Sequence, residues 1–235
     1  ARLIMGLLIH TKNEIKIIGD KSLSKRDFYR IIKPLKKFGA KFKSNSGKLP
    51  IIIKGTNLPQ PIKYNETKGS AQCKSAIMLA ALNTNGETII KAKKSRNHSE
   101  LLFKHLNLPV KVKRKNYVDI IKIRGKKKIK PLNYKIPSDI SSSAFFIVLT
   151  LLTKNSKLLI KNININPSRL GVIKILNKMG AKIKLLNIKK INNEKTANIF
   201  VKSTNNLKGI NCPSNLNSSA IDEFLIIFLA AAKAK

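Results

Sequence analysis

The sequence predicts an α/β protein built from repeated units, each of about 70 residues with two helices and several strands. A small-residue start, an apolar helical run and a β-branched run occur in that order at 70–90 and again at 138–160. Ser75-Ala76 and Ser143-Ala144 match in register, 68 residues apart. A third start at 218–221 opens the last apolar helix. The alternative is an ordinary α/β domain with chance similarity between its helices.

A second element alternates with the first: an amphipathic helix that ends at a glycine and runs into a strand. Segments 35–42 (LKKFGAKF) and 176–183 (LNKMGAKI) are near copies of each other. Their glycines, Gly39 and Gly180, can adopt the left-handed conformation that commonly ends a helix. A weaker copy has Asn107 in this place, and asparagine is the next-best residue for that conformation.

Strands are expected in the remaining segments that are rich in β-branched residues and bounded by Gly, Asn, Pro or Asp. Pro131, Asn133 and Pro137 interrupt this patterning after a lysine-rich run. We therefore expect a first domain at 1–137 and the beginning of a second at 138–235. The expected strands are 15–18, 49–54, 87–90, 120–124, 157–161, 183–186 and 199–202.

The composition allows a packed core and sets a strongly positive field. Hydrophobic residues make up 43% of the 235 residues, so wholesale disorder is not expected. Lys and Arg number 48 against 11 Asp and Glu, a formal net charge of +37, which attracts polyanions and anionic small molecules. A basic nucleic-acid-binding protein is therefore one open alternative. Lysines spread along almost the whole chain beside abundant Ile and Asn, however, which is typical of an AT-rich coding sequence.

The two cysteines, Cys73 and Cys212, have no CxxC spacing and no His-rich neighbourhood, so the sequence predicts no metal site, no disulfide framework and no cofactor. Cys73 lies in an apolar helical pattern and is expected to be a core residue. The longest nearly unbroken apolar run, 144–152, is far short of the roughly 20 residues that span a bilayer. Since no signal-peptide pattern is present either, we expect a cytoplasmic protein with no membrane partner.

Both ends of the chain have the pattern of an interrupted helix. The run at 1–9 is apolar without a start Met or an N-cap, and the run at 224–232 is apolar without a glycine stop. We expect the chain to be part of a longer protein.

The segment at 19–26 (GDKSLSKR) follows an expected strand and precedes an amphipathic helix. Its composition suits either an anion cradle of backbone N–H groups and a guanidinium, or a solvated turn with a helix cap. Its residue order resembles the GD-x-SL-x-x-R signature of the enolpyruvylshikimate-phosphate synthases, and the SAQ form at 70–72 resembles the bacterial branch of that family. Further matching motifs follow the family's order: RLIMGL at 2–7, GKLPI at 47–51, SAQCKSA at 70–76, SRNHSE at 95–100, PSDISS at 137–142, NPSRLG at 166–171, MGA at 179–181 and IDE at 221–223.

The resemblance implies a fold of repeated βαβαββ units in two similar domains, an inside-out α/β barrel. It implies a transferase, monomeric when complete, that moves the enolpyruvyl group of phosphoenolpyruvate to the 5-hydroxyl of shikimate 3-phosphate. The hydroxyl attacks C2 of phosphoenolpyruvate, C3 is protonated, and phosphate then leaves. Both substrates carry phosphate and carboxylate groups, so guanidinium forks and helix N-termini are expected to bind them.

The resemblance also implies roles for particular residues. Arg26 would hold phosphoenolpyruvate, where the alternative is a surface arginine. Ser70, Ala71 and Gln72 would hold shikimate 3-phosphate at a helix start, and Gln72 would also reach phosphoenolpyruvate. Arg96 would bind the shikimate phosphate, with Ser95 assisting. The alternatives are a plain N-cap at Ser70 and a loop salt bridge at Arg96.

Asp222 is the expected catalytic residue and a shikimate 3-phosphate ligand. By resemblance it accepts the proton of the 5-hydroxyl. It lies beside Glu223 in an otherwise apolar segment, where desolvation would raise its pKa and suit it to act as a base. The alternative is a first-turn acid that the helix dipole favours.

The sequence also departs from the family pattern. Ser138 replaces a glycine and Asn97 replaces an acid. The family's upstream Lys-Ser…Arg and downstream Lys-Glu-x-x-Arg segments are absent. We therefore expect the chain alone to be inactive, and an inactive pseudoenzyme fragment is a further alternative.

Overall fold

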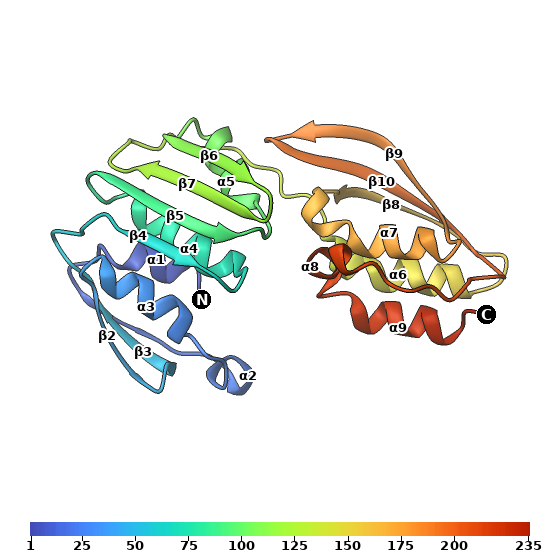
Figure 1. The fold of residues 1–235 in the computed structure, drawn as a ribbon, viewed down its shortest axis with the longest axis horizontal. Coiled ribbons are helices and arrows are strands. Elements are labelled where there is room, and N and C mark those ends of the chain that lie inside the picture. Colours follow the sequence, from blue (N-terminus) through green and yellow to red (C-terminus); the bar gives the residue numbers. More distant parts are fainter. The chain divides into compact units, whose positions relative to one another are not determined.

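The computed structural model describes every residue from Ala1 to Lys235 and forms two compact units. The N-terminal unit is Ala1–Pro131 and the C-terminal unit is Leu132–Lys235, each with its own hydrophobic core. No helix or strand lies at 125–137, the irregular segment that contains the end of the first unit. Figure 1 shows the elements of both units in chain order.

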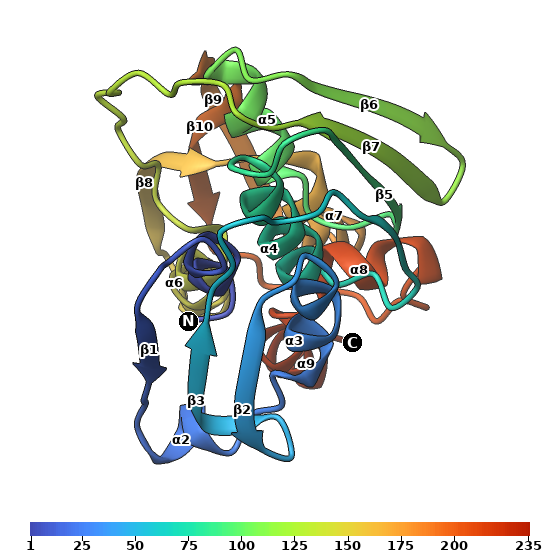
Figure 2. The ribbon, with the colours of Figure 1, turned by 90° about the vertical axis from the view of Figure 1, so that its left-hand side faces the viewer.

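In the N-terminal unit, helices pack between a three-stranded and a four-stranded sheet (Figures 1 and 2). The first sheet has the order β1-β3-β2 and is antiparallel. The second has the order β4-β5-β7-β6, in which only the β4–β5 pair is parallel. The strands are β1 (Glu14–Ile17), β2 (Lys41–Asn45), β3 (Lys48–Lys54), β4 (Lys63–Glu66), β5 (Glu87–Lys93), β6 (Val110–Lys115) and β7 (Val118–Arg124). The helices are α1 (Ile4–Leu8), α2 (Lys21–Ser24), α3 (Tyr29–Lys37), α4 (Ala71–Ala81) and α5 (His98–His105).

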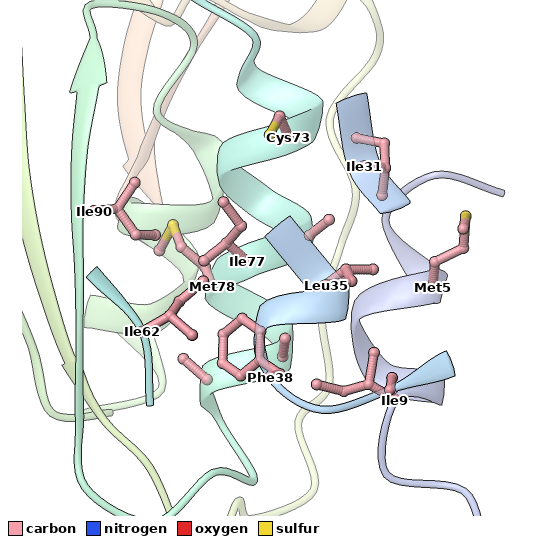
Figure 3. Packing of buried hydrophobic residues seen from close by; sticks show 14 of the residues in the cluster. Met5, Ile9, Ile31, Leu35, Phe38, Ile62, Cys73, Ile77, Met78 and Ile90 are labelled. Atoms are coloured by element: carbon pink, nitrogen blue, oxygen red, sulfur yellow. The ribbon is translucent and has the colours of Figure 1, made fainter. Parts of the chain in front are cut away.

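Helix α4 is the centre of this unit. It is buried on most of its circumference and packs against α1, α3 and β5. Figure 3 shows Met5 of α1, Leu35 of α3 and Ile77 of α4 in one apolar cluster. Gly6 lets α1 approach closely, because a Cβ at this position would lie 2.1 Å from the backbone oxygen of Ala76. The middle of α4 is therefore packed closely against α1.

In the C-terminal unit, helices cover one face of a three-stranded antiparallel sheet with the order β8-β10-β9 (Figure 1). The strands are β8 (Lys157–Asn164), β9 (Lys182–Ile191) and β10 (Glu194–Lys202). The helices are α6 (Ile140–Leu152), α7 (Gly171–Lys178), α8 (Asn217–Ala220) and α9 (Phe224–Ala232), with 3-10 turns η1 (Pro167–Arg169) and η2 (Ser214–Leu216).

The last helix differs from its prediction. The start at 218–221 does not open one continuous helix, because α8 ends at Ala220 and a three-residue turn precedes α9. Residues 214–220 and α9 are bent by 119° relative to each other. No single helix has the length and apolar composition of a membrane span, and only this bent pair meets those two criteria together.

The repeats predicted from the sequence are confirmed in the topology. The order β4-α4-β5-α5-β6-β7 is one complete βαβαββ unit, with β7 inserted between β5 and β6. The segment α1-β1-α3-β2-β3 and the segment α6-β8-α7-β9-β10 repeat its last five elements with the same strand order. In the third repeat, Ser138 makes a parallel bridge to Ile163 where the first strand would lie. Left-handed residues end α3, α5 and α7 as expected: Gly39, Asn107 and Gly180.

One strand was not expected. Strand β4 is short, and two of its four residues, Lys63 and Asn65, are exposed. Its inward residues are Tyr64 and the buried Glu66, so the alternation of apolar and polar residues that marks a strand is missing. The carboxylate of Glu66 has a local reason to be buried, because it receives backbone N–H bonds from the loop that leads into α4.

Candidate active site

The segment that carries the GD-x-SL-x-x-R resemblance forms a capped turn. Asp20 caps α2, and its Oδ1 accepts a hydrogen bond of 2.6 Å from the backbone N–H of Leu23. Ser24 Oγ donates to the carbonyl of Gly19 at 3.1 Å. Because Asp20 uses this helix start for itself, the turn favours the capping interpretation over a backbone anion cradle. The exposed guanidinium of Arg26, two residues after α2, remains available to bind an anion.

Two further arginines, Arg2 and Arg30, meet at the side chain of Gln72. Arg2 Nη1 donates to Gln72 Oε1 at 2.7 Å, and Arg30 Nη2 donates to the same oxygen at 3.1 Å. Arg2 also donates to the backbone oxygen of Asp27 at 3.0 Å and stacks over the Phe28 ring, 5.2 Å from its centroid. The Nε atoms of both arginines are buried and make no hydrogen bond within the chain.

The electrostatics of this cluster favour an anion. Burial lowers the pKa of the Arg2 guanidinium, and the positive charges of Arg30 and Arg26 lower it further. Arg2 therefore interacts electrostatically with two further guanidinium groups, and Asp27 is the acid that acts on it. A carboxylate or phosphate at this place would be bound by planar forks of N–H donors.

The N-terminus of α4 adds a second set of donors. Ser70 caps the helix, and its Oγ accepts from the N–H of Cys73 at 3.2 Å. The N–H of Ser70 donates to Glu66 Oε2 at 3.0 Å, and that of Lys68 donates to Oε1 at 3.1 Å. These bonds leave the first-turn N–H groups of Ala71 and Gln72 at a helix N-terminus, where the helix dipole favours negative charge.

Arg96 belongs to the loop between β5 and α5, and its backbone oxygen accepts a hydrogen bond of 2.7 Å from Lys74 Nζ of α4. Ser95 Oγ next to it is buried and makes no hydrogen bond within the chain. The N-terminal unit thus brings Ser70, Ala71, Gln72 and Arg96 to the same end of α4. The sequence did not indicate that Arg2 and Arg30 join them.

Asp222 lies in the turn between α8 and α9, and its side chain is exposed. The expectation that it is desolvated was wrong. The buried acid of this turn is its neighbour Glu223, whose side chain is 2% exposed and whose Oε1 lies 3.6 Å from Arg169 Nη2. Arg169 pairs with the buried Glu223, whereas Asp222 lies at the surface of the unit.

Arg169 connects three segments of the C-terminal unit. Its Nη2 lies 3.2 Å from Asp139 Oδ1 at the start of α6 and also contacts Ser141 Oγ, which donates to Glu223. Although burial of Asp139 opposes this, hydrogen bonds from Ser142 and the charge of Arg169 lower the pKa of the Asp139 carboxyl. The network fixes the loop before α7 to the starts of α6 and α9.

Arginine recurs at one topological position. Arg26, Arg96 and Arg169 each lie between the second strand and the second full helix of their repeat, before α3, α5 and α7. Two of them reach the N-terminal end of the first helix of the repeat, Arg96 through Lys74 and Arg169 through Asp139. The repeat therefore places an arginine residue near a helix start more than once in the same chain.

The cysteines take no part in this site. Cys73 is buried, and its Sγ donates to the backbone oxygen of Arg30 at 3.3 Å. Burial, and secondarily the charge of Glu66, raises the pKa of this thiol to about 12. The prediction that Cys73 is a core residue is confirmed, whereas Cys212 is exposed.

The βαβαββ repeats place the chain in a fold class that includes a solved enolpyruvyl transferase. The enolpyruvyl transferase NikO from Streptomyces tendae shares this fold with a TM-score of 0.66 at 12% identity, over 99% of this chain and 53% of that one. The chain belongs to the EPSP synthase (3-phosphoshikimate 1-carboxyvinyltransferase) family, whose family model matches residues 1–235.

Individual relatives agree with this assignment. The 3-phosphoshikimate 1-carboxyvinyltransferases of Petrotoga mobilis and Ruthia magnifica are 42% and 43% identical to this chain over its whole length. EPSP synthase from Acinetobacter baumannii superposes with a TM-score of 0.84 at 38% identity, over 100% of this chain and 52% of that structure. The chain spans about half the length of the curated relatives it matches, 54% and 53% of these two.

Proposed function

We propose that the full-length protein transfers the enolpyruvyl group of phosphoenolpyruvate to the 5-hydroxyl of shikimate 3-phosphate, releasing phosphate. The observation that carries the proposal is the convergence, in one unit of a family member, of the Arg2–Arg30–Gln72 cluster with the start of α4 and the Arg96 loop. Each of these groups binds anions, and both substrates are anions with phosphate and carboxylate groups.

The proposed roles follow the chemistry of each position. Arg26 holds phosphoenolpyruvate beside the guanidinium cluster, and Gln72 reaches both substrates. Ser70 and Ala71 hold shikimate 3-phosphate at the start of α4, and Arg96 binds its phosphate. Arg2 and Arg30 orient the Gln72 amide, because both donate to its oxygen and leave its NH₂ group to donate elsewhere.

The reaction is an addition followed by an elimination. The 5-hydroxyl oxygen attacks C2 of phosphoenolpyruvate, its proton passes to Asp222, and C3 takes up a proton to become a methyl group. The bond from C2 to the phosphate oxygen then breaks while C3 loses a proton, which restores the double bond. An exposed carboxylate such as Asp222 becomes an effective base when substrate binding removes its water.

We further propose that residues 1–137 form most of one family domain and that 138–235 begin the second. The complete protein is proposed to work as a cytoplasmic monomer that needs no cofactor. Sedimentation of the full-length protein at micromolar concentration tests the monomer directly, since a dimer would double the measured mass.

A phosphate-release assay on the full-length protein tests the function. Phosphate is expected only when phosphoenolpyruvate and shikimate 3-phosphate are both present. Arg26→Met should raise KM for phosphoenolpyruvate by about tenfold or more, the effect of losing one hydrogen bond between charged groups. Lys111→Met, which removes a positive charge from the exposed face of β6, is the matched control and should change nothing. No release with both substrates, together with tight and salt-sensitive oligonucleotide binding, would support a nucleic-acid-binding protein instead.

A further inference from the structure

A buried ion pair joins α4 to the loop that carries Arg96. Lys74 Nζ lies 2.7 Å from Glu100 Oε1, and the two side chains are 0% and 3% exposed. The same ammonium donates to the backbone oxygen of Arg96 at 2.7 Å. Lys74 lies two residues after Gln72 on α4, and Glu100 lies in the first turn of α5. One buried cation therefore contacts both ends of the segment 96–100.

Stability alone does not account for this pair. Burying an ammonium and a carboxylate removes the hydration of both groups, and replacing such a pair by apolar residues is often neutral or stabilising. What an apolar pair lacks is a donor for the Arg96 carbonyl. An ammonium has three donors in a compact group, so Lys74 can bind Glu100 and that carbonyl together.

A second link follows the same path. Ser75 Oγ on α4 and Ser99 Oγ on α5 lie 2.6 Å apart. Ser75 follows Lys74 in the sequence, and Ser99 precedes Glu100. The loop is thus fixed to α4 at the Arg96 carbonyl, at Ser99 and at Glu100. Such a set of contacts restricts where the Arg96 guanidinium can lie relative to the first turn of α4.

Resting on the proposed function, we propose that Lys74 and Glu100 are positioning residues that hold the Arg96 loop against the N-terminus of α4. Their buried side chains act on substrate through Arg96. A phosphate gains most from a guanidinium and a helix N-terminus when both are already in place, since ordering them on binding would weaken affinity. The pair therefore sets the affinity for the phosphate of shikimate 3-phosphate.

Three variants of the full-length protein test this proposal: Lys74→Met, Glu100→Gln and the double variant. Lys74→Met should raise KM for shikimate 3-phosphate by about tenfold or more, with kcat and KM for phosphoenolpyruvate changed much less. Glu100→Gln should have a smaller effect, because Lys74 can still donate to the Arg96 carbonyl. Lys111→Met is the control for loss of a lysine.

The double variant separates positioning from stability. It leaves no buried charge unpaired, so it should unfold at a higher urea concentration than Lys74→Met, and it also serves if that single variant fails to fold. Its KM for shikimate 3-phosphate should nevertheless stay raised, because the donor to Arg96 is still missing. A KM that returns to the wild-type value along with stability would overturn the proposal.

Amide hydrogen exchange tests the positioning role without any measurement of activity. Exchange at residues 95–98 should speed up in Lys74→Met and in the double variant relative to residues 99–105 of α5, which a uniformly destabilised protein would not show. If the wild-type protein released no phosphate, the proposed function would fail while this exchange pattern still reported on the loop. Unchanged exchange at 95–98 would refute the positioning role whatever the activity.

Discussion

Alanine substitutions of two adjacent acids, Asp222 and Glu223, are expected to have different effects: one lowers turnover and the other lowers stability. Glu223 is 2% exposed and faces Arg169, which is 13% exposed, at 3.6 Å. Removing one partner of a buried ion pair costs about 3–5 kcal/mol. Arg169 keeps Asp139 at 3.2 Å, but that carboxylate is 53% exposed and compensates only in part. We therefore expect Glu223→Ala to lower the free energy of unfolding by about 3 kcal/mol, the low end of that range.

Asp222→Ala removes an exposed side chain, so its effect on stability should stay within about 0.5 kcal/mol. Its effect on turnover should be large, about 100-fold or more, because a positioned proton acceptor typically contributes that much. Shikimate 3-phosphate binding should be largely retained. Glu223→Ala should keep most of its turnover under conditions where the protein is folded.

Urea unfolding of the full-length proteins, followed by circular dichroism, measures the first effect, and phosphate release measures the second. Amide exchange in α9 locates the loss of stability in the C-terminal unit. Equal destabilisation by the two substitutions would refute the reasoning from burial. Unchanged turnover in Asp222→Ala would remove Asp222 from the role of proton acceptor.

Three further predictions concern packing, pH and thiol reactivity. Gly6→Ala should destabilise the protein by about 3 kcal/mol in urea unfolding, because its Cβ would lie 2.1 Å from a backbone oxygen of α4, whereas Gly209→Ala, whose nearest contact is 3.7 Å, should be tolerated. Because the pKa of Asp139 is lowered, this carboxylate contributes fully to stability above its usual pKa of 3.8, and the contribution is lost as pH falls through the pKa of the folded protein. Asp139→Asn should therefore weaken the fall in the free energy of unfolding at acid pH, and an unchanged fall would contradict this. Iodoacetamide at pH 8 should label Cys212 but not Cys73 in the native protein, as peptide mass mapping can show, and labelling of both would contradict the burial of Cys73.

The sequence predicted most of the fold because the features that specify it are local. Gly39 and Asn107 are left-handed residues that end helices, and the apolar pattern of α4 predicts its burial. Strand β4 was missed because a buried acid, Glu66, takes the inward position that an apolar residue usually fills. Its burial depends on two N–H donors from a loop that no short-range pattern reveals.

The site was less predictable, because its members depend on contacts between distant residues. Arg2 lies 70 residues from Gln72, and Arg30 lies 42 residues from it, yet both donate to its amide. Burial was misassigned at Asp222 for the same reason. The residues around 222 are apolar, but Arg169, 54 residues earlier in the chain than its partner Glu223, decides which acid turns inward.

Sheet topology explains why the distant pieces meet. In the second repeat β4 runs parallel to β5, so the carboxyl ends of both strands lie at the same end of the sheet. Strand β4 leads into the N-terminus of α4 and β5 leads into the Arg96 loop, which places a helix dipole and this loop at that end of the sheet. The parallel bridge of Ser138 to Ile163 does the same for the start of α6 and Arg169. In the second repeat Lys74 holds the Arg96 carbonyl beside that helix N-terminus, whereas in the third repeat the Arg169 guanidinium lies beside Asp139 and Glu223. The same juxtaposition thus gives a proposed binding site in one repeat and an ion-pair network in the other.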